Sequence, residues 1–166
     1  MHIYGVSFDL VGKQPIVLLK TAEGNKFLPI WIGHPEAAAI LMKLQSQAAP
    51  RPMTHDLLSD MLEQLGAQVI RITVTELREN TFYAQITVVQ DGTEIEVDSR
   101  PSDAIALAIR AEAPIFAADR VIEESAIEFE GEEVDPDELE AEVAKFKHFL
   151  EEVTPEDFAV EDGEDE

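Results

Sequence analysis

The alternation of apolar and polar residues predicts three β-strands at the start of the chain, over residues 3–10, 15–22 and 26–32. A helix follows and begins near Pro35, because a proline loses no hydrogen bond in the first helical turn. Its buried face is predicted from apolar residues at the spacing of one helix side: Ala37, Ile40, Leu41, Leu44 and Ala48. Two prolines, at positions 50 and 52, then end this helix.

A second helix is predicted to begin with Thr54 as its N-cap and to end at Gly66, where glycine suits the C′ position. It carries an apolar stripe made of Leu57, Leu58, Met61, Leu62 and Leu65. Three more strands are expected over residues 70–75, 82–88 and 95–97.

The Asp91-Gly92 pair predicts a hairpin between the last two of these strands. Pro101 opens another helix and Pro114 ends it. The inner face of this helix is made of Ala104, Ile105, Ala108 and Ile109. Residues 115–117 and 126–129 are short enough to be edge strands.

The predicted order is strand-strand-strand-helix, twice, so the fold class is α+β with two similar halves in one compact domain over residues 1–125. The two strand-to-helix junctions, residues 31–38 and 97–104, are alike. Each carries a titratable or basic residue, then a proline, then an acid in the first turn. This likeness indicates an internal duplication, or else only the residues that helix starts commonly favour.

An acidic tail follows this domain. Residues 126–152 combine a linker with an amphipathic helix that begins at Asp135 and Pro136. The apolar stripe of that helix is Leu139, Val143, Phe146 and Leu150, which predicts that it docks on the domain or on another chain. Residues 153–166 are acidic and are predicted to be disordered.

The composition narrows the class of protein. The chain has 166 residues, of which 45% are hydrophobic, which is enough for a packed core. It has no cysteine, which excludes a disulfide scaffold and a cysteine nucleophile. No signal-peptide pattern and no apolar run of about 20 residues is present, so we expect a cytoplasmic protein with no membrane partner.

The net charge of −23 is unevenly distributed. Residues 1–122 hold 15 acidic and 10 basic side chains, whereas residues 123–166 hold 20 acidic and 2 basic ones. Such a tail repels phosphate backbones, which disfavours nucleic acid as a tight partner. The tail is either a solvated segment or one that covers a basic surface.

Two candidate sites lie at predicted helix starts. Asp98 and Asp103 are paired carboxylates that suit a hard cation such as Mg²⁺ or Mn²⁺, and Arg100 suits a phosphate. His55 is a candidate general base, although His55 and Asp56 are neighbours on one helix and point in different directions. The alternative for both sites is that these residues only cap helices and complement their dipoles.

A third candidate combines His34 and Glu36 with Trp31, as a metal site or a surface on which a base stacks. The alternative is that Trp31 belongs to the core. A Gly-rich phosphate loop, a His-Glu-x-x-His pair and a Gly-x-Ser-x-Gly elbow are all missing from the sequence.

Four spaced motifs resemble those of the bifunctional nuclease family over residues 1 to about 125. They are Leu28-Pro29-Ile30-Trp31-Ile32-Gly33, the stretch from Arg51 to Leu58, Thr81-Phe82-Tyr83-Ala84, and the stretch from Asp98 to Ala108. The resemblance implies a compact α+β domain that self-associates, with a dimer as the first guess, and nuclease activity on DNA and RNA.

Carried over by this resemblance, the catalytic residues would be His55, Asp56, Asp98 and Asp103. The substrate-binding residues would be Arg51, Thr54, Arg100 and Ser102. Asp98 and Asp103 would also bind the metal. The leading hypothesis is therefore a phosphodiesterase that depends on Mg²⁺ or Mn²⁺ and on no organic cofactor. The alternative is a non-catalytic regulatory or protein-interaction domain whose tail binds a basic partner.

Overall fold

A computed structural model of the chain describes residues 1–9 and 13–128. In these ranges the chain forms two four-stranded sheets and four helices, which confirms the α+β class and the two strand-strand-strand-helix halves. The predicted tail helix and the acidic residues 153–166 lie outside the described residues. No helix within the described ranges has the length and apolarity needed to cross a bilayer.

The first sheet has the strand order β1-β2-β3-β8, with every neighbour antiparallel. Its strands are β1 (His2–Asp9), β2 (Gln14–Lys20), β3 (Lys26–Trp31) and β8 (Ile127–Glu128). The alternation of apolar and polar residues predicts these strands because one face of the sheet is buried. Val17 pairs with Ile30 and Leu19 pairs with Leu28, and all four side chains are at most 2% exposed.

The second sheet has the order β6-β5-β4-β7, in which only β7 runs parallel to its neighbour. Its strands are β4 (Ala67–Arg78), β5 (Thr81–Gln90), β6 (Thr93–Ser99) and β7 (Ile115–Ala117). Asp91 and Gly92 both have positive φ, as a tight two-residue hairpin requires, so the predicted hairpin is confirmed.

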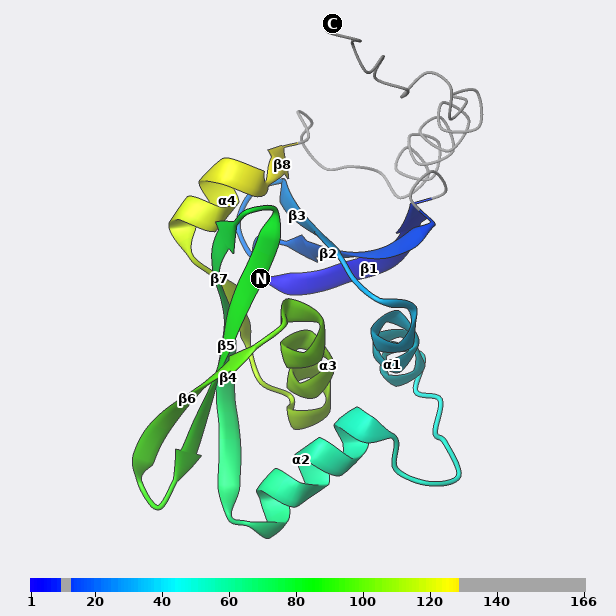
Figure 1. Ribbon diagram of the computed structural model, residues 1–166, viewed down its shortest axis with the longest axis vertical. Coiled ribbons are helices and arrows are strands. Elements are labelled where there is room, and N and C mark those ends of the chain that lie inside the picture. Colours follow the sequence, from blue (N-terminus) through cyan, green and yellow to red (C-terminus); the bar gives the residue numbers. More distant parts are fainter. Residues whose placement is uncertain (10–12, 129–166) are drawn as a thin grey trace, which may run out of the picture.

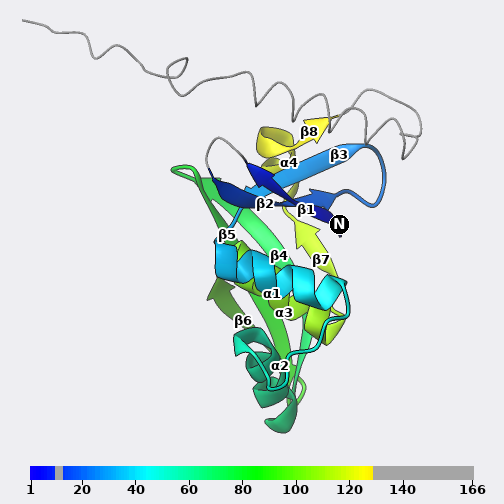
Figure 2. The same ribbon diagram turned by 90° about the vertical axis from the view of Figure 1, so that its right-hand side faces the viewer.

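The helices are α1 (His34–Leu44), α2 (Thr54–Gln64), α3 (Pro101–Ala111) and α4 (Asp119–Ser125). Figures 1 and 2 show α3 in the angle between the two sheets, with α1 beside it. The residues from Ala104 to Ala108 are at most 1% exposed, and three of these five are alanines. Small side chains let α3 approach both its neighbouring helices and the second sheet.

Two details correct the sequence prediction. The first helix ends at Leu44 and Ser46 adopts a positive φ, so Ala48 lies in the following loop rather than on the helix. The N-cap of α2 is Met53, not Thr54, and the Asp56 carboxylate accepts a hydrogen bond from the Met53 backbone N–H at 2.9 Å. This acid in the first turn anchors the helix start in place of a hydroxyl cap.

The apolar stripe of α2 is mostly exposed. Amphipathic helices usually turn such a stripe to the core, but only Leu62 packs against the core here. Leu57, Met61 and Leu65 are 52%, 53% and 64% exposed. The helix instead presents His55 and Asp56 to α3, so its polar start, rather than its whole apolar stripe, faces the interior.

Candidate functional site at the helix starts

The first turns of α1, α2 and α3 meet in a group of four polar residues, here called the helix-start cluster: Glu36, His55, Arg100 and Asp103. His55 Nε2 lies 2.9 Å from Asp103 Oδ1, although the two residues are 48 positions apart. Arg100 donates from Nε to Asp103 Oδ2 at 2.8 Å and from Nη2 to Glu36 Oε1 at 2.8 Å. The two similar strand-to-helix junctions thus face each other, with Arg100 between the acids of their first turns.

The charges in this cluster support one another. Burial raises the pKa of Asp103, but the hydrogen bonds from Arg100 and His55 outweigh it and hold that pKa below its ordinary value. Asp103 and Glu36 in turn raise the pKa of the Arg100 guanidinium. Asp103 is therefore a carboxylate at neutral pH, and both of its oxygens accept hydrogen bonds.

The orientation of His55 follows from that carboxylate. An ionised Asp103 can only accept, so a neutral His55 donates its proton from Nε2 and keeps Nδ1 as its acceptor. The His55 side chain is only 11% exposed, whereas 67% of the Arg100 side chain is exposed. The cluster therefore combines a held imidazole with a guanidinium that solvent can reach.

Asp56 lies in a different environment from its neighbour His55. Its Oδ1 accepts from Arg110 Nε at 2.6 Å, and the Met53 backbone N–H and Arg110 together lower its pKa. Arg110 is only 6% exposed and also donates to the carbonyls of Ala106 and Ala39. The two side chains thus point to different partners, as two adjacent helical residues should.

Arg110 was missed by the sequence analysis. The available signal was a cation seven residues after Asp103, within an otherwise apolar helix, which places both residues on the same side of α3. Glu36 was a candidate only together with His34 and Trp31. The structure brings it to Arg100 instead, and Trp31 is 51% exposed, so the alternative that Trp31 belongs to the core is wrong.

The other predicted site residues lie outside the cluster. Thr54 is exposed at the first position of α2, and Ser102 is buried in the first turn of α3. Arg51 lines a cavity beside the loop that joins α1 to α2. Asp98 is exposed on β6, opposite Gln85 of β5, and within the described ranges no hydrogen bond or ion pair joins it to the cluster. The catalytic and binding roles of all these residues stay predictions.

The predicted metal ligands can be tested against this geometry. Arg100 and His55 occupy both carboxylate oxygens of Asp103, and the Arg100 charge beside it repels a cation. Nowhere in residues 1–9 and 13–128 do three His, Asp or Glu side chains gather as a metal site. As placed, Asp98 and Asp103 do not fit a shared Mg²⁺ or Mn²⁺, and metal dependence stays a prediction.

Comparisons with known proteins point to one family. The family model of the bifunctional nuclease domain matches residues 17–130, a range that contains the whole helix-start cluster. An uncharacterized protein of Mycobacterium tuberculosis is 38% identical over 161 residues, covering 95% of this chain and 96% of that protein. Bifunctional nuclease 1 of Oryza sativa subsp. japonica is 29% identical over 109 residues, which is 63% of this chain and 33% of that protein. Bifunctional nuclease 1 of Arabidopsis thaliana is 28% identical over 106 residues, which is 61% of this chain and 33% of that protein.

Proposed function

The chain belongs to the bifunctional nuclease domain family, and we propose that it hydrolyses phosphodiester bonds in DNA and RNA. The observation that carries this proposal is the contact between His55 and Asp103 at 2.9 Å, with Arg100 on the other carboxylate oxygen. A carboxylate that fixes an imidazole, next to an exposed guanidinium, combines a general base with a phosphate ligand.

The proposed chemistry uses these three side chains. His55 would accept a proton at Nδ1 from a water molecule, whose oxygen then attacks phosphorus as the bond to the leaving sugar oxygen breaks. The leaving oxygen would take up a proton from solvent, and His55 would later release its own proton to solvent. Asp103 would hold the imidazole and stabilise its charged form. Arg100, with its exposed side chain, would bind the phosphate. Because the ring is nearly buried, a water molecule suits this access better than a bulkier nucleophile.

The test is a cleavage assay on single-stranded and duplex DNA and RNA, with Mg²⁺, Mn²⁺ or EDTA. The proteins are wild type, His55→Gln, Asp103→Asn and Arg120→Gln, purified side by side. Arg120 is the control because its exposed ion pair with Glu76 lies on α4 and β4, outside the cluster. We expect the cluster variants to lose about 10²-fold or more in rate, as the loss of a general base does.

The outcomes distinguish cleavage by this protein from cleavage by a contaminating nuclease. Equal traces of cleavage in all four proteins would contradict the proposal, since no residue of the cluster would then matter. Activity that disappears only in EDTA would support the predicted metal dependence, with ligands other than the Asp98 and Asp103 pair as placed here. A cytoplasmic location is part of the same proposal.

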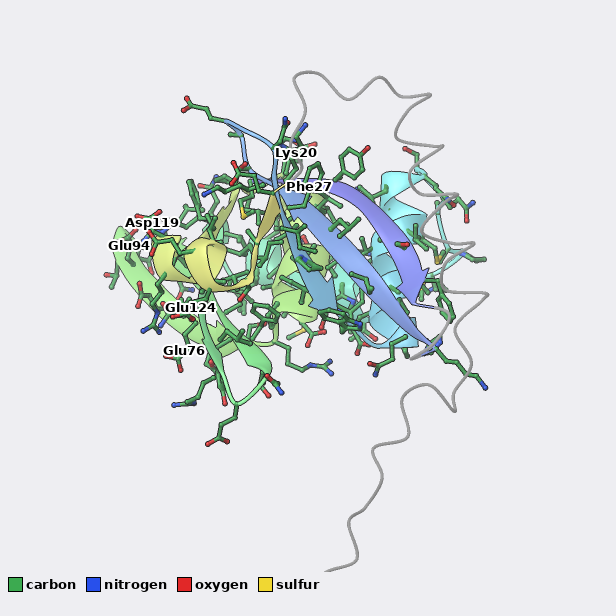
Figure 3. All side chains as sticks on the ribbon, turned by 90° about the horizontal axis from the view of Figure 1, so that it is seen from above. Lys20, Phe27, Glu76, Glu94, Asp119 and Glu124 are labelled. Atoms are coloured by element: carbon green, nitrogen blue, oxygen red, sulfur yellow. The ribbon has the colours of Figure 1, made fainter. Side chains whose placement is uncertain are left out.

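A second candidate function is a non-catalytic interaction domain. It is favoured by the same contacts, because Arg100 and Asp103 also tie together the starts of α1, α2 and α3. Figure 3 shows the acids Asp119 and Glu124 on the side of the second sheet and α4, and neither forms an ion pair with a described residue, which suits a basic partner. In this case Asp103→Asn lowers the melting temperature, and none of the four proteins in the cleavage assay cleaves nucleic acid under any condition.

A further inference from the structure

A cavity of about 490 Å³ lies between the end of α1, the loop that joins α1 to α2, the start of α2 and the end of α3. This volume is within the range of about 300–1,000 Å³ that is typical of small-molecule sites. The cavity shares no lining residue with the helix-start cluster. Figure 1 shows the α1–α2 loop on the opposite side of the molecule from the second sheet.

Two cations at this cavity form no ion pair with a described residue. The structure describes all six arginines of the chain, and five of them form ion pairs with carboxylates: Arg71, Arg78, Arg100, Arg110 and Arg120. Arg51 forms none with any described residue, and neither does Lys43, which lines the same cavity. In a chain with a net charge of −23, a cavity lined by three cations and one acid favours an anionic ligand.

The floor of the cavity is fixed before any ligand arrives. Arg110 and Asp56 line it, and their ion pair of 2.6 Å is held by the Ala39 and Ala106 carbonyls and by the Met53 N–H. Asp56 interacts with both Arg110 and Lys43, and it offsets one of the three cations that line the cavity, so a net positive charge remains. Preformed sites lose less entropy on binding than sites that must order.

The remaining lining residues are Ser46 and Gln47, which are polar, and apolar side chains that include Met42, Pro52 and Met53. Methionine thioethers make favourable contacts with aromatic rings, and an apolar wall adds little for a bare inorganic anion. The lining therefore suits an anion with a flat organic body. Two cations match the charge of a single phosphate monoester, whereas a long polyanion would also meet the acidic remainder of the molecule.

We propose that this cavity binds a nucleoside monophosphate, with its phosphate against Lys43 and Arg51 and its base against the methionines. The proposal concerns binding and does not require that the chain cleave nucleic acid. The same chemical unit occurs as a free nucleotide and as the 5′-phosphorylated end of a strand, and the charge of the chain favours the free nucleotide.

The test is isothermal titration calorimetry on the full chain with AMP, adenosine and inorganic phosphate at low salt. The cavity variant is Lys43→Gln/Arg51→Gln, and both of its sites are exposed, so the fold is retained. The control Lys26→Gln/Arg120→Gln removes the same charge on β3 and α4. We expect wild type and control to bind AMP at least about tenfold more tightly than they bind adenosine or phosphate, and at least about tenfold more tightly than the cavity variant binds AMP. Adenosine and the cavity variant lose the two charge-assisted contacts, and inorganic phosphate loses the contacts of the base.

Every result that differs from this expectation overturns a stated part of the proposal. Wild type that does not bind AMP, or a cavity variant that binds it as wild type does, would exclude the cavity as a nucleotide site. Phosphate that binds as tightly as AMP would exclude a role for the nucleoside. A short 5′-phosphorylated oligonucleotide that binds more tightly than AMP would exclude the free nucleotide as the ligand. None of these readouts measures cleavage, so their failure is distinct from failure of the nuclease proposal.

Discussion

At the scale of single residues, Asp103 makes the stability of the fold depend on pH. Its pKa lies below the ordinary value of 3.8 because Arg100 and His55 donate to it. A carboxyl group with a lower pKa in the folded state stabilises the protein above its unfolded pKa, and that stabilisation is lost as pH falls through the folded pKa. We therefore expect Asp103→Asn to reduce the loss of unfolding free energy below about pH 5, measured by urea unfolding.

A matched control for this prediction is Asp98→Asn. The Asp98 side chain is exposed and forms no hydrogen bond or ion pair with a described residue, so that variant should follow the pH dependence of wild type. Asp56 keeps its own lowered pKa in both variants, and part of the dependence therefore persists. Identical slopes for wild type and Asp103→Asn would show that the cluster does not hold the Asp103 charge.

Arg110 gives a second prediction at this scale. Its side chain is 6% exposed and donates to Asp56, Ala39 and Ala106, so Arg110→Ala removes the cation that pairs with the Asp56 carboxylate and one donor from each of two carbonyls. We expect this change to lower the free energy of unfolding by about 2–3 kcal/mol. The exposed ion pair of Arg120 should contribute less than about 1 kcal/mol, so Arg120→Ala is the control. Equal effects of the two changes in chemical unfolding would contradict a special role for Arg110.

The candidate residues could be found from the sequence, but their pairing could not. His55, Arg100 and Asp103 stand out because they sit beside prolines and helix starts. Which of them touch depends on how α2 and α3 pack, and the contact between His55 and Asp103 spans 48 positions. Arg110 was not identified because a single cation in an apolar helix is usually predicted to be a surface residue.

At the scale of elements, period-two patterns predicted the strands well because each sheet has one buried face. Val17, Leu19, Ile72 and Val74 are all fully buried on alternate positions of their strands. Helix α4 was missed because seven residues carry too little pattern to distinguish a helix from a turn. The exposure of the α2 stripe could not be predicted, because a sequence pattern shows that a helix has an apolar face but not what covers that face.

That exposed face of α2 leads to a prediction about self-association, which the sequence resemblance also implies. Leu57, Met61 and Leu65 are more than half exposed, and a second copy of the chain would cover them. We expect Leu65→Glu to lower the molecular mass in solution toward the monomer, measured by sedimentation, with little change in unfolding free energy. Leu62 packs against the core, so Leu62→Ala should cost about 1–3 kcal/mol and leave the assembly surface intact. A wild type that is already monomeric at all concentrations would exclude this surface as a self-association interface.

At the scale of the whole molecule, the negative net charge opposes the binding of the proposed nucleic-acid substrate. The proposed substrate is a polyanion, yet the chain carries a net charge of −23, most of it after residue 122. The two cations at the cavity and the exposed Arg100 are too few to offset that repulsion, since each phosphate contact needs its own cation. The acidic tail should therefore weaken any binding of nucleic acid by the domain before it.

Removal of the tail tests this argument. A chain that ends at Glu128 keeps every residue of the helix-start cluster and of the cavity, and should bind single-stranded DNA more tightly than the full chain does. Because the effect is a repulsion between charges in water, the difference between the two chains should shrink as salt rises, with a screening length of about 10 Å at 0.1 M. Fluorescence anisotropy with a labelled oligonucleotide over a salt series measures both quantities. Equal affinities at low salt would mean that the tail does not face the nucleic acid, and a difference that persists at 1 M salt would mean that the tail blocks the site by contact rather than by charge.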